Sequence, residues 1–326
     1  MTSEPRIYRS LEEVGSDFGP CALSIGNFDG VHAGHRRIFR RVVELARERD
    51  WKPSALTFHP HPTKVVAPER APRLLTTPDE RCRLMAGEGI EQILILPFGW
   101  DIARLDPEGF VQNILVGKLG VRAVLVGSNF RFGHRHAGDT KRLAELGAAY
   151  GIVTEVIPAI RVRGCQISSS EIRRLIGVGN VSTAARMLGR PYSLEGDIVP
   201  GFGIGSTQTV PTLNLKTDAE VVMPAGVYIT RTSDVDDGRT WPAVTNVGSR
   251  PTFGGSEVSV ETHLLAALDG KAPRRIRVEF LRRVREERKF PSAEDLKAQI
   301  ARDVDRAKRY FRLLDRLLYS KRTPVS

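Results

Sequence analysis

The chain has 326 residues, enough for two domains of ordinary size, and its 41% hydrophobic and 27% charged residues are typical of a globular protein. No run approaches the roughly 18–20 apolar residues that cross a bilayer, and the N-terminus lacks a secretory signal, so we expect a cytoplasmic protein. Three widely separated cysteines without a CxxC pair indicate neither a zinc site nor a disulfide framework, whereas the net charge of +11 suggests anionic partners without distinguishing nucleotides, nucleic acid and acidic membranes.

Short apolar runs alternate with helical patterns in the first half of the chain. This rhythm predicts an α/β domain with a doubly wound, Rossmann-like parallel sheet, in which ligands bind beyond the carboxyl ends of the strands. The predicted strands are Cys21–Ile25, Ser54–Phe58, Gln92–Pro97, Ala123–Val126 and Ile152–Ile157, and the predicted helices run from about His35 to Arg49 and over Pro78–Gly87, Pro107–Lys118 and Thr140–Tyr150.

The pattern changes after about residue 190, where short strands are separated by turns rich in glycine and proline. Such strands predict a small antiparallel β-barrel, followed by one long C-terminal helix over Ala293–Leu318. Two short helices, Glu171–Ile176 and Ser182–Leu188, bridge the halves, so we expect domains over residues 1–185 and 186–326. The predicted barrel strands are Tyr192–Val199, Gly226–Arg231, Trp241–Val247, Ser256–Leu265 and Ile276–Leu281.

The segment GNFDGVHAGH follows the first strand and opens the first helix. Backbone N–H groups and the positive helix end can receive phosphate there, and Gly26, Gly30 and Gly34 let the backbone approach a ligand closely. His32 and His35 are three residues apart, so their imidazoles can converge on one phosphate and neutralise charge as pyrophosphate leaves. The segment therefore predicts a nucleoside-triphosphate site rather than a glycine-rich turn with two incidental histidines.

Three later segments fit the same pocket. TFHPHP, at the end of the second strand, offers His59 and His61; a metal site is conceivable, but no carboxylate or third ligand is nearby, so a structural loop is favoured. VGSNFRFGHRHAGD carries aromatic and basic side chains suited to a ring system. In ISSSEIRR, Ser170 is predicted to cap a helix that starts at Glu171, with Arg173 in its first turn. The interpretation as a phosphate clamp competes there with a plain capped helix.

The barrel half carries polar groups suited to phosphoryl transfer. Thr212 and Asn214 of PTLNL alternate along a strand, so they face the same side, and their oxygen atoms suit Mg²⁺ bound to ATP. Glu261, in the otherwise apolar VETHLL, could accept the proton of an attacking hydroxyl. Each signal is weak alone, since Glu261 could also face solvent.

Together these motifs, in this order over about residues 18–318, resemble the bacterial bifunctional riboflavin kinase/FAD synthetase family. The resemblance implies an N-terminal FMN adenylyltransferase domain of the HxGH nucleotidyltransferase superfamily and a C-terminal riboflavin kinase barrel. ATP with Mg²⁺ would phosphorylate riboflavin to FMN in the barrel, and the N-terminal domain would adenylylate FMN to FAD with release of pyrophosphate.

The resemblance also implies roles for individual residues. In the kinase, Glu261 would be the base, and Thr212 and Asn214 would hold Mg²⁺ through ATP. The remaining implied residues are His32 and His35 as catalytic groups of the adenylyltransferase, Gly26, Asn27, Phe28, Asp29, Gly34, Asn129, Arg131, Ser168, Ser169, Ser170 and Arg173 as its ATP- and FMN-binding groups, and Gly203, Gly205 and Pro211 as further binding groups of the kinase.

One loop departs from the family's pattern, and it leaves alternatives open. Gly205 is kept, but Ser206 replaces the usual arginine, and Thr209 and Val210 replace the usual glycine–aromatic pair before PTLNL. One alternative is therefore an FAD synthetase with an inactive flavin-binding barrel. The charge motivates another, a flavin-responsive nucleic-acid-binding regulator, although no helix-turn-helix or RNA-binding aromatic motif is present. We expect small-molecule partners, no nucleic acid or membrane, and a monomer or weak homo-oligomer.

Overall fold

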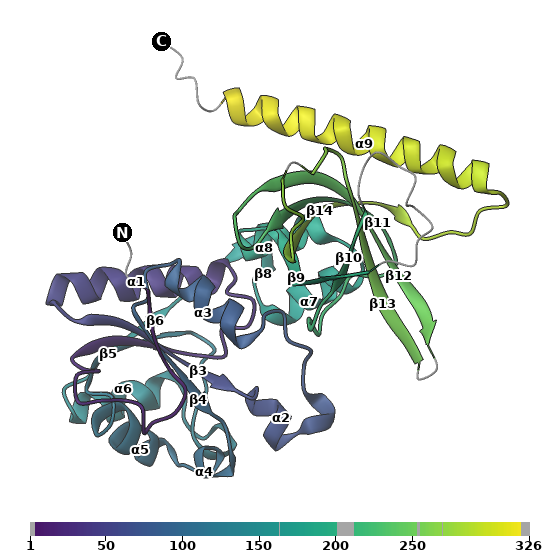
Figure 1. Cartoon of the computed structure of the whole chain (residues 1–326). Coiled ribbons are helices and arrows are strands. Elements are labelled where there is room, and N and C mark those ends of the chain that lie inside the picture. Colours follow the sequence, from purple (N-terminus) through teal and green to yellow (C-terminus); the bar gives the residue numbers. More distant parts are fainter. Residues whose placement is uncertain (1–3, 163, 201–211, 253–254, 269, 321–326) are drawn as a thin grey trace. The chain divides into compact units, whose positions relative to one another are not determined.

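The computed structural model describes residues 4–162, 164–200, 212–252, 255–268 and 270–320. The chain forms two compact units, Met1–Ser169 and Ser170–Ser326, which we describe separately (Figure 1). This division lies before the two bridging helices, and the domain boundary at residue 185 stays a prediction. None of the helices in the described ranges is long and apolar enough to span a bilayer.

The first unit is built on a six-stranded parallel sheet with the order β1-β4-β3-β2-β5-β6. The chain leaves β2 toward β3 on one side and later places β5 on the other, so the strand order reverses at β2. Ligands of such sheets bind at this switch point, beyond the carboxyl ends of the strands. The strands are β1 (Arg6–Tyr8), β2 (Cys21–Ile25), β3 (Lys52–His59), β4 (Gln92–Pro97), β5 (Val121–Gly127) and β6 (Val153–Ile157). The predicted doubly wound sheet is confirmed.

Helices cover both faces of this sheet, which is why its central strands, such as β2 and β4, are mostly apolar and buried. Helix α1 buries Ile38, Phe39 and Val42 on one face, whereas Phe110 and Leu115 pack on the other. The predicted helix Pro107–Lys118 is instead a short α5 and a wider, π-type turn over Phe110–Val116. The helices are α1 (Ala33–Arg49), α2 (Pro62–Val66), α3 (Pro78–Ala86), α4 (Trp100–Ala103), α5 (Pro107–Gly109) and α6 (Thr140–Ala149), with single turns at Pro68–Arg70 and His134–His136 and a small hairpin of β7 (Arg161–Val162) and β8 (Cys165–Gln166).

The second unit is a closed antiparallel barrel with the order β10-β13-β12-β11-β14-β9, preceded by two helices and followed by one. The predicted barrel is confirmed. Its helix α7 begins at Ser169, so the prediction that Ser170 caps a helix starting at Glu171 is wrong: Ser170 already lies in the first turn. The elements are α7 (Ser169–Gly177), α8 (Val181–Leu188), β9 (Tyr192–Val199), β10 (Thr212–Lys216), β11 (Gly226–Asp234), β12 (Thr240–Thr252), β13 (Gly255–Leu264), β14 (Arg275–Glu286) and α9 (Ala293–Ser320).

The barrel interior combines apolar side chains with a chain of buried hydroxyl groups. The Thr245 hydroxyl oxygen lies 2.7 Å from that of Thr230 and 3.0 Å from that of Thr262, so the three groups satisfy one another across β11, β12 and β13. Tyr228 and Phe280 stack edge to face beside them. Since side chains alternate along a strand, the residues between these positions face outward.

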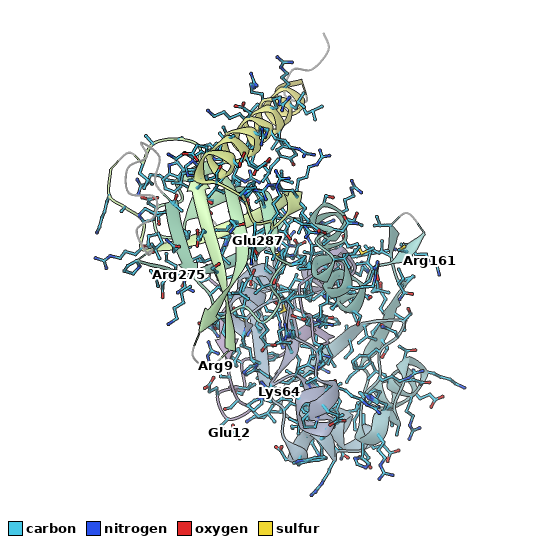
Figure 2. All side chains as sticks on the ribbon, turned by 90° about the vertical axis from the view of Figure 1, so that its right-hand side faces the viewer. Arg9, Glu12, Lys64, Arg161, Arg275 and Glu287 are labelled. Carbon is cyan, nitrogen blue, oxygen red and sulfur yellow. The ribbon has the colours of Figure 1, made fainter. Side chains whose placement is uncertain are left out.

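Helix α9 lies across part of the outer surface of the barrel (Figure 1). Ile229, Val244 and Ala307 belong to one apolar cluster between helix and strands. A buried ion pair fixes the helix further, because Arg285 donates to Asp303 at 2.9 Å and Gln299 donates to the other carboxylate oxygen. Side chains stand out along the rest of the helix (Figure 2), as expected for a solvated face.

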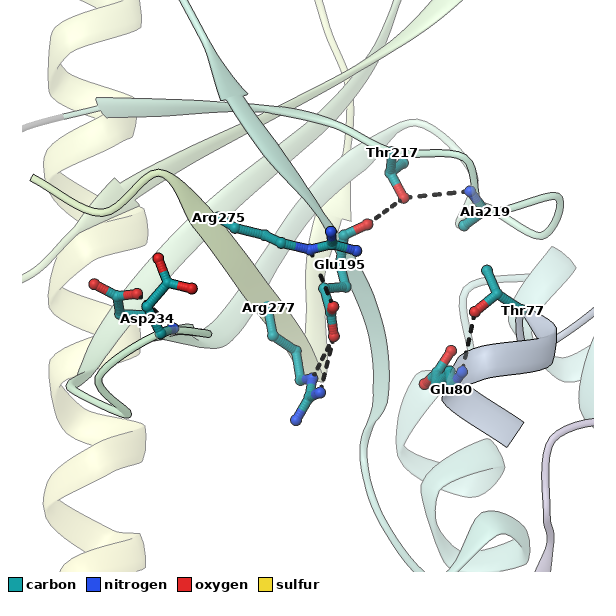
Figure 3. Close-up of polar contacts among 9 residues, drawn as sticks. Thr77, Glu80, Glu195, Thr217, Ala219, Asp234, Arg275 and Arg277 are labelled. Carbon is teal, nitrogen blue, oxygen red and sulfur yellow. Dashed lines mark hydrogen bonds and ion pairs between the residues drawn. The ribbon is translucent and has the colours of Figure 1, made fainter. Parts of the chain in front are cut away.

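Two arginines of β14 are paired with a carboxylate of the barrel unit. Arg275 and Arg277 converge on the carboxylate of Glu195 in β9, at 3.2 and 2.8 Å (Figure 3). Thr217 donates to the backbone oxygen of Glu195 and braces the same strand. This arrangement is that of an amphipathic strand with paired charges on its outer face.

We expect Asp303→Asn to loosen α9, because an amide cannot replace both acceptor oxygens beside the half-buried Arg285 guanidinium. The free energy of opening the helix, measured by hydrogen exchange of its amide groups, should fall by about 2–3 kcal/mol. Asp305→Asn is the matched control, since Asp305 is exposed on the same helix and should change this value by less than about 0.5 kcal/mol. Equal effects of the two substitutions would contradict the anchoring role of the pair.

Candidate functional site

The loop between β2 and α1, residues 26–32, lies at the switch point of the first unit's sheet. Its backbone is strained: φ is 46° at Phe28, 80° at Gly30 and 39° at Val31. Only glycine adopts such angles readily, so a bulky and a β-branched residue hold them at a cost of about 1–3 kcal/mol each. Strain of this kind persists only where surrounding contacts impose it.

Asp29 supplies those contacts. Its buried carboxylate accepts hydrogen bonds from the backbone N–H groups of Leu75 and Thr76 and from the Thr76 hydroxyl, at 3.0 to 3.2 Å. Gly30 donates to the same hydroxyl, and the Ser169 hydroxyl donates to the backbone oxygen of Asp29 at 2.8 Å. Asp29 was predicted to bind ligand; these contacts indicate that its carboxylate holds the loop in place.

The loop brings the two predicted catalytic histidines together. His32 caps α1, because its Nδ1 accepts the backbone N–H of His35 at 3.3 Å. The two rings stack with centroids 3.6 Å apart, and Phe28 meets His35 edge to face. A Cβ at position 34 would lie 3.1 Å from the His32 ring, so Gly34 leaves room for this arrangement.

A buried arginine lies close to the histidine pair. Arg81 of α3 is 2% exposed and donates to the Thr57 hydroxyl and the Phe58 carbonyl, at 3.1 and 3.3 Å. Burial lowers the pKa of His35 well below its ordinary value, and the nearby His32 and Arg81 lower it further. Near neutral pH His35 is therefore uncharged, and Arg81 carries the positive charge beside it.

The end of β3 is tied to the same loop. The Thr57 hydroxyl donates to the backbone oxygen of Asn27 at 3.1 Å, and the Asn27 amide nitrogen lies 3.1 Å from Nε2 of His61. Nδ1 of His61 accepts the backbone N–H of Thr63 and caps α2. These contacts favour the structural-loop interpretation for His61. The described residues contain no cluster of three or more histidine, cysteine or acidic side chains able to hold a metal.

The remaining predicted residues of this site are distributed over two segments. Asn129 and Arg131 follow β5 and are exposed, with Arg131 3.8 Å from Asp139. Ser168 precedes α7, and Ser169 is the residue that bonds to Asp29. Ser170 and Arg173 lie on α7 in the second unit, so their predicted phosphate clamp stays a prediction.

The barrel places its predicted residues on one outer face. Along β10, Leu213 and Leu215 are buried, whereas Thr212 and Asn214 alternate with them on the outside, as predicted. Asn214 pairs in register with Glu261 of β13, so these two side chains are neighbours. Gly203, Gly205 and Pro211, and with them Ser206, Thr209 and Val210 of the altered loop, lie outside the described residues.

Several residues of these clusters were not predicted from the sequence. Asn246 of β12 lies opposite Glu261 on its other side, and His263 of β13 lies opposite Thr212, with Nδ1 3.4 Å from its hydroxyl oxygen. Both could have been found from two-residue alternation, His263 within VETHLL and Asn246 within the predicted strand Trp241–Val247. Arg81 gives no such signal, because an arginine in an amphipathic helix normally faces water.

We expect Asp29→Asn to destabilise the first unit by about 1–3 kcal/mol, because an amide nitrogen would meet a backbone N–H donor. Hydrogen exchange of the β2 amide groups measures this free energy. Asp50→Asn is the matched control: Asp50 is exposed in a left-handed conformation that asparagine adopts readily. An unchanged free energy for Asp29→Asn would contradict the role assigned to its carboxylate.

The lowered pKa of His35 predicts a pH dependence of stability. Unfolded histidine titrates near pH 6.5, so below that pH the unfolded chain binds a proton that the folded His35 does not. Proton binding to the unfolded chain favours unfolding, so the free energy of unfolding is highest above about pH 6.5 and decreases as the pH falls below it. The free energy of unfolding the first unit, measured at about pH 7 and 5.5, should therefore fall less in His35→Gln than in the unaltered chain; identical slopes would exclude this linkage.

Comparisons with known proteins cover nearly the whole chain. Residues 15–171 match the FAD synthetase family and residues 188–311 the riboflavin kinase family. The bifunctional riboflavin kinase/FMN adenylyltransferases of Escherichia coli K12 and Pseudomonas fluorescens are each 34% identical, over 90% and 93% of this chain and 93% and 97% of their own lengths. A crystal structure from Streptococcus pneumoniae, titled a macrolide-efflux protein, matches with a TM-score of 0.83 and 26% identity over 94% of this chain and 99% of its own. The chain therefore belongs to the bifunctional riboflavin kinase/FMN adenylyltransferase family.

Proposed function

We propose that this chain makes FAD from riboflavin in two ATP-dependent steps, one in each unit. The observation that carries the proposal is that each unit gathers its own reactive cluster: stacked histidines at the switch point of the sheet, and a carboxylate beside hydroxyl and amide oxygens on the barrel. The matches to both families, in the same order along the chain, support the same assignment.

The adenylyl transfer takes place in the first unit. A phosphate oxygen of FMN attacks the α-phosphorus of ATP in line, the bond from that phosphorus to the bridging oxygen breaks, and pyrophosphate leaves. The phosphates are bound by backbone N–H groups at the start of α1 and in the loop before it, other than those of Gly26, Gly30 and Val31, which bond within the protein. His32 and His35 hydrogen-bond to the developing charge; because His35 is uncharged near neutral pH, it acts as a hydrogen-bond donor rather than as a cation.

Two further groups of residues complete the proposed adenylyltransferase site. Asn129 and Arg131 contact a ring system of the substrates. Ser168, Ser169, Ser170 and Arg173 act on the phosphates, and Ser169 also holds Asp29. Strain at Phe28 and Val31 supports a binding role for the loop of residues 26–32, because backbone in unfavourable conformations is concentrated at functional sites.

The phosphorylation takes place on the barrel. The terminal ribityl hydroxyl of riboflavin attacks the γ-phosphorus of ATP, Glu261 accepts its proton, and ADP leaves. Thr212 and Asn214 fit Mg²⁺, because hard oxygen donors stand on one face beside the carboxylate. When bound with ATP, Mg²⁺ neutralises charge on the phosphates. Gly203, Gly205 and Pro211 are proposed to contribute to nucleotide and flavin binding.

The proposed partners are riboflavin, FMN and ATP, with no nucleic acid. The paired arginines of β14 support this, because they neutralise carboxylates of the barrel itself. A monomer or weak homo-oligomer in the cytoplasm remains the proposed state of the protein.

The two activities should separate by mutation. With Mg²⁺ and ATP, the unaltered protein should convert riboflavin to FMN and FAD, and FMN to FAD, as resolved by chromatography. His32→Ala with His35→Ala should reduce FAD formation from FMN at least about 100-fold while FMN formation from riboflavin continues. Glu261→Gln should reduce FMN formation from riboflavin while FAD still forms from added FMN, because each variant removes groups from one site only.

Each variant is the control for the other unit. If FAD forms from FMN but riboflavin is never phosphorylated by the unaltered protein, the barrel only binds flavin. Loss of both activities in the histidine variant, with the fold intact by circular dichroism, would contradict the two-site proposal. Turnover of neither flavin, together with tight and salt-sensitive RNA binding, would favour a regulator.

A further inference from the structure

Thr212 and His263 face each other across two barrel strands. They are direct partners in the antiparallel register of β10 and β13, and Nδ1 of the imidazole lies 3.4 Å from the threonine hydroxyl oxygen. Thr212 is exposed, whereas His263 is half-buried. The next outward pair along the same strands is Asn214 with Glu261. Each proposed oxygen donor on β10 therefore has one polar partner on β13.

This contact matters because a hydroxyl group has one proton and two lone pairs. When the oxygen coordinates a cation, a lone pair must point toward the cation, and the proton must be directed to an acceptor elsewhere. Among the described contacts of the Thr212 hydroxyl, Nδ1 of His263 at 3.4 Å is a group able to accept this proton. A neutral imidazole can accept at Nδ1 only if its proton is on Nε2. The opposite tautomer would donate to the threonine oxygen and occupy a lone pair.

We propose that His263 is a positioning residue of the kinase site: its Nδ1 accepts the Thr212 hydroxyl proton and so directs the oxygen toward phosphate-bound Mg²⁺. The proposal rests on the riboflavin kinase function proposed above. Two alternate residues of β13 then have different roles: Glu261 accepts the proton of the riboflavin hydroxyl, and His263 orients the hydroxyl group of Thr212, the proposed magnesium ligand opposite it. Partners of this kind, which hydrogen-bond to a metal ligand, typically change metal affinity or activity by about 10–100-fold when they are removed.

The first test is the tautomer of His263 in the unaltered, nucleotide-free protein. Nitrogen NMR of ¹⁵N-histidine-labelled full-length chain distinguishes an accepting Nδ1 from a protonated one, and the signal is assigned by its absence from His263→Asn. We expect the Nε2–H tautomer, and we expect Thr212→Val to shift the Nδ1 resonance. A protonated Nδ1, or a resonance that Thr212→Val leaves unchanged, would overturn the proposal without reference to activity.

The second test separates positioning from packing through kinetics of FMN formation. His263→Leu removes the acceptor and should raise the KM for Mg·ATP by about 10–100-fold, with the KM for riboflavin unchanged. His263→Asn offers an amide oxygen near the position of Nδ1 and should restore most of the loss. In a Thr212→Val background, His263→Leu should have no further effect, because the hydroxyl that it orients is gone. Lys216→Gln, on the same face of β10, is the matched control and should leave both KM values unchanged.

The outcomes also separate this proposal from the kinase function. If the unaltered protein makes no FMN from riboflavin, the proposed kinase fails, whereas the tautomer measurement still decides whether the hydrogen bond exists. If FMN forms but His263→Leu keeps its KM for Mg·ATP, or if the effects of the His263 and Thr212 changes multiply, only the positioning role is overturned. If His263→Leu does not fold, the KM for Mg·ATP of His263→Asn and the tautomer of His263 in the unaltered chain test the proposal instead.

Discussion

The carboxylate of Asp29 fixes the backbone on which the first unit's site depends. Its two oxygen atoms accept hydrogen bonds from a segment more than forty residues later in the chain, at Leu75 and Thr76. These bonds supply the free energy that keeps Phe28 and Val31 in the left-handed region, where neither residue would settle by itself. The same backbone leads directly into His32, the cap of α1. The stacked imidazoles therefore have fixed positions before any substrate binds.

The barrel meets a different constraint, the two-residue period of its strands. One set of positions fills the interior, where buried threonine hydroxyls satisfy one another. The other set faces outward and is divided in two: α9 covers its apolar part around Ile229 and Val244, and Asn214 and Glu261 lie in the polar part. Strand β12 contributes to both parts, because Val244 packs against α9 and Asn246 lies opposite Glu261. The alternation of side chains along one strand therefore provides both the packing surface and part of the candidate site.

Local patterns were enough to predict the architecture, and long-range contacts were not predictable from them. Alternating strands and helices indicated the parallel sheet, and the three-residue spacing of His32 and His35 at a helix start indicated their proximity. The structural role of Asp29 depends on partners distant in sequence, so local patterns did not reveal it; the ligand contact that the family resemblance implies for Asp29 stays a prediction. The burial of Arg81 was equally unpredictable from local sequence, because it follows from the packing of α3 against β3. The start of α7 was misjudged because Ser169 and Ser170 are both acceptable near a helix N-terminus.

Some of the positively charged side chains of this basic protein are paired within its own units. Net charge influences solubility and association rates, but recognition depends on where the charges lie. In β14, Arg277 is paired with Glu195 and Arg285 with Asp303, both carboxylates of the same unit. In the first unit the buried cation is Arg81, whose guanidinium is directed to Thr57 and Phe58. Burial, more than the charges of His32 and Arg81, holds the pKa of His35 well below its ordinary value, so the phosphate contact proposed for this ring is a hydrogen bond from an uncharged imidazole.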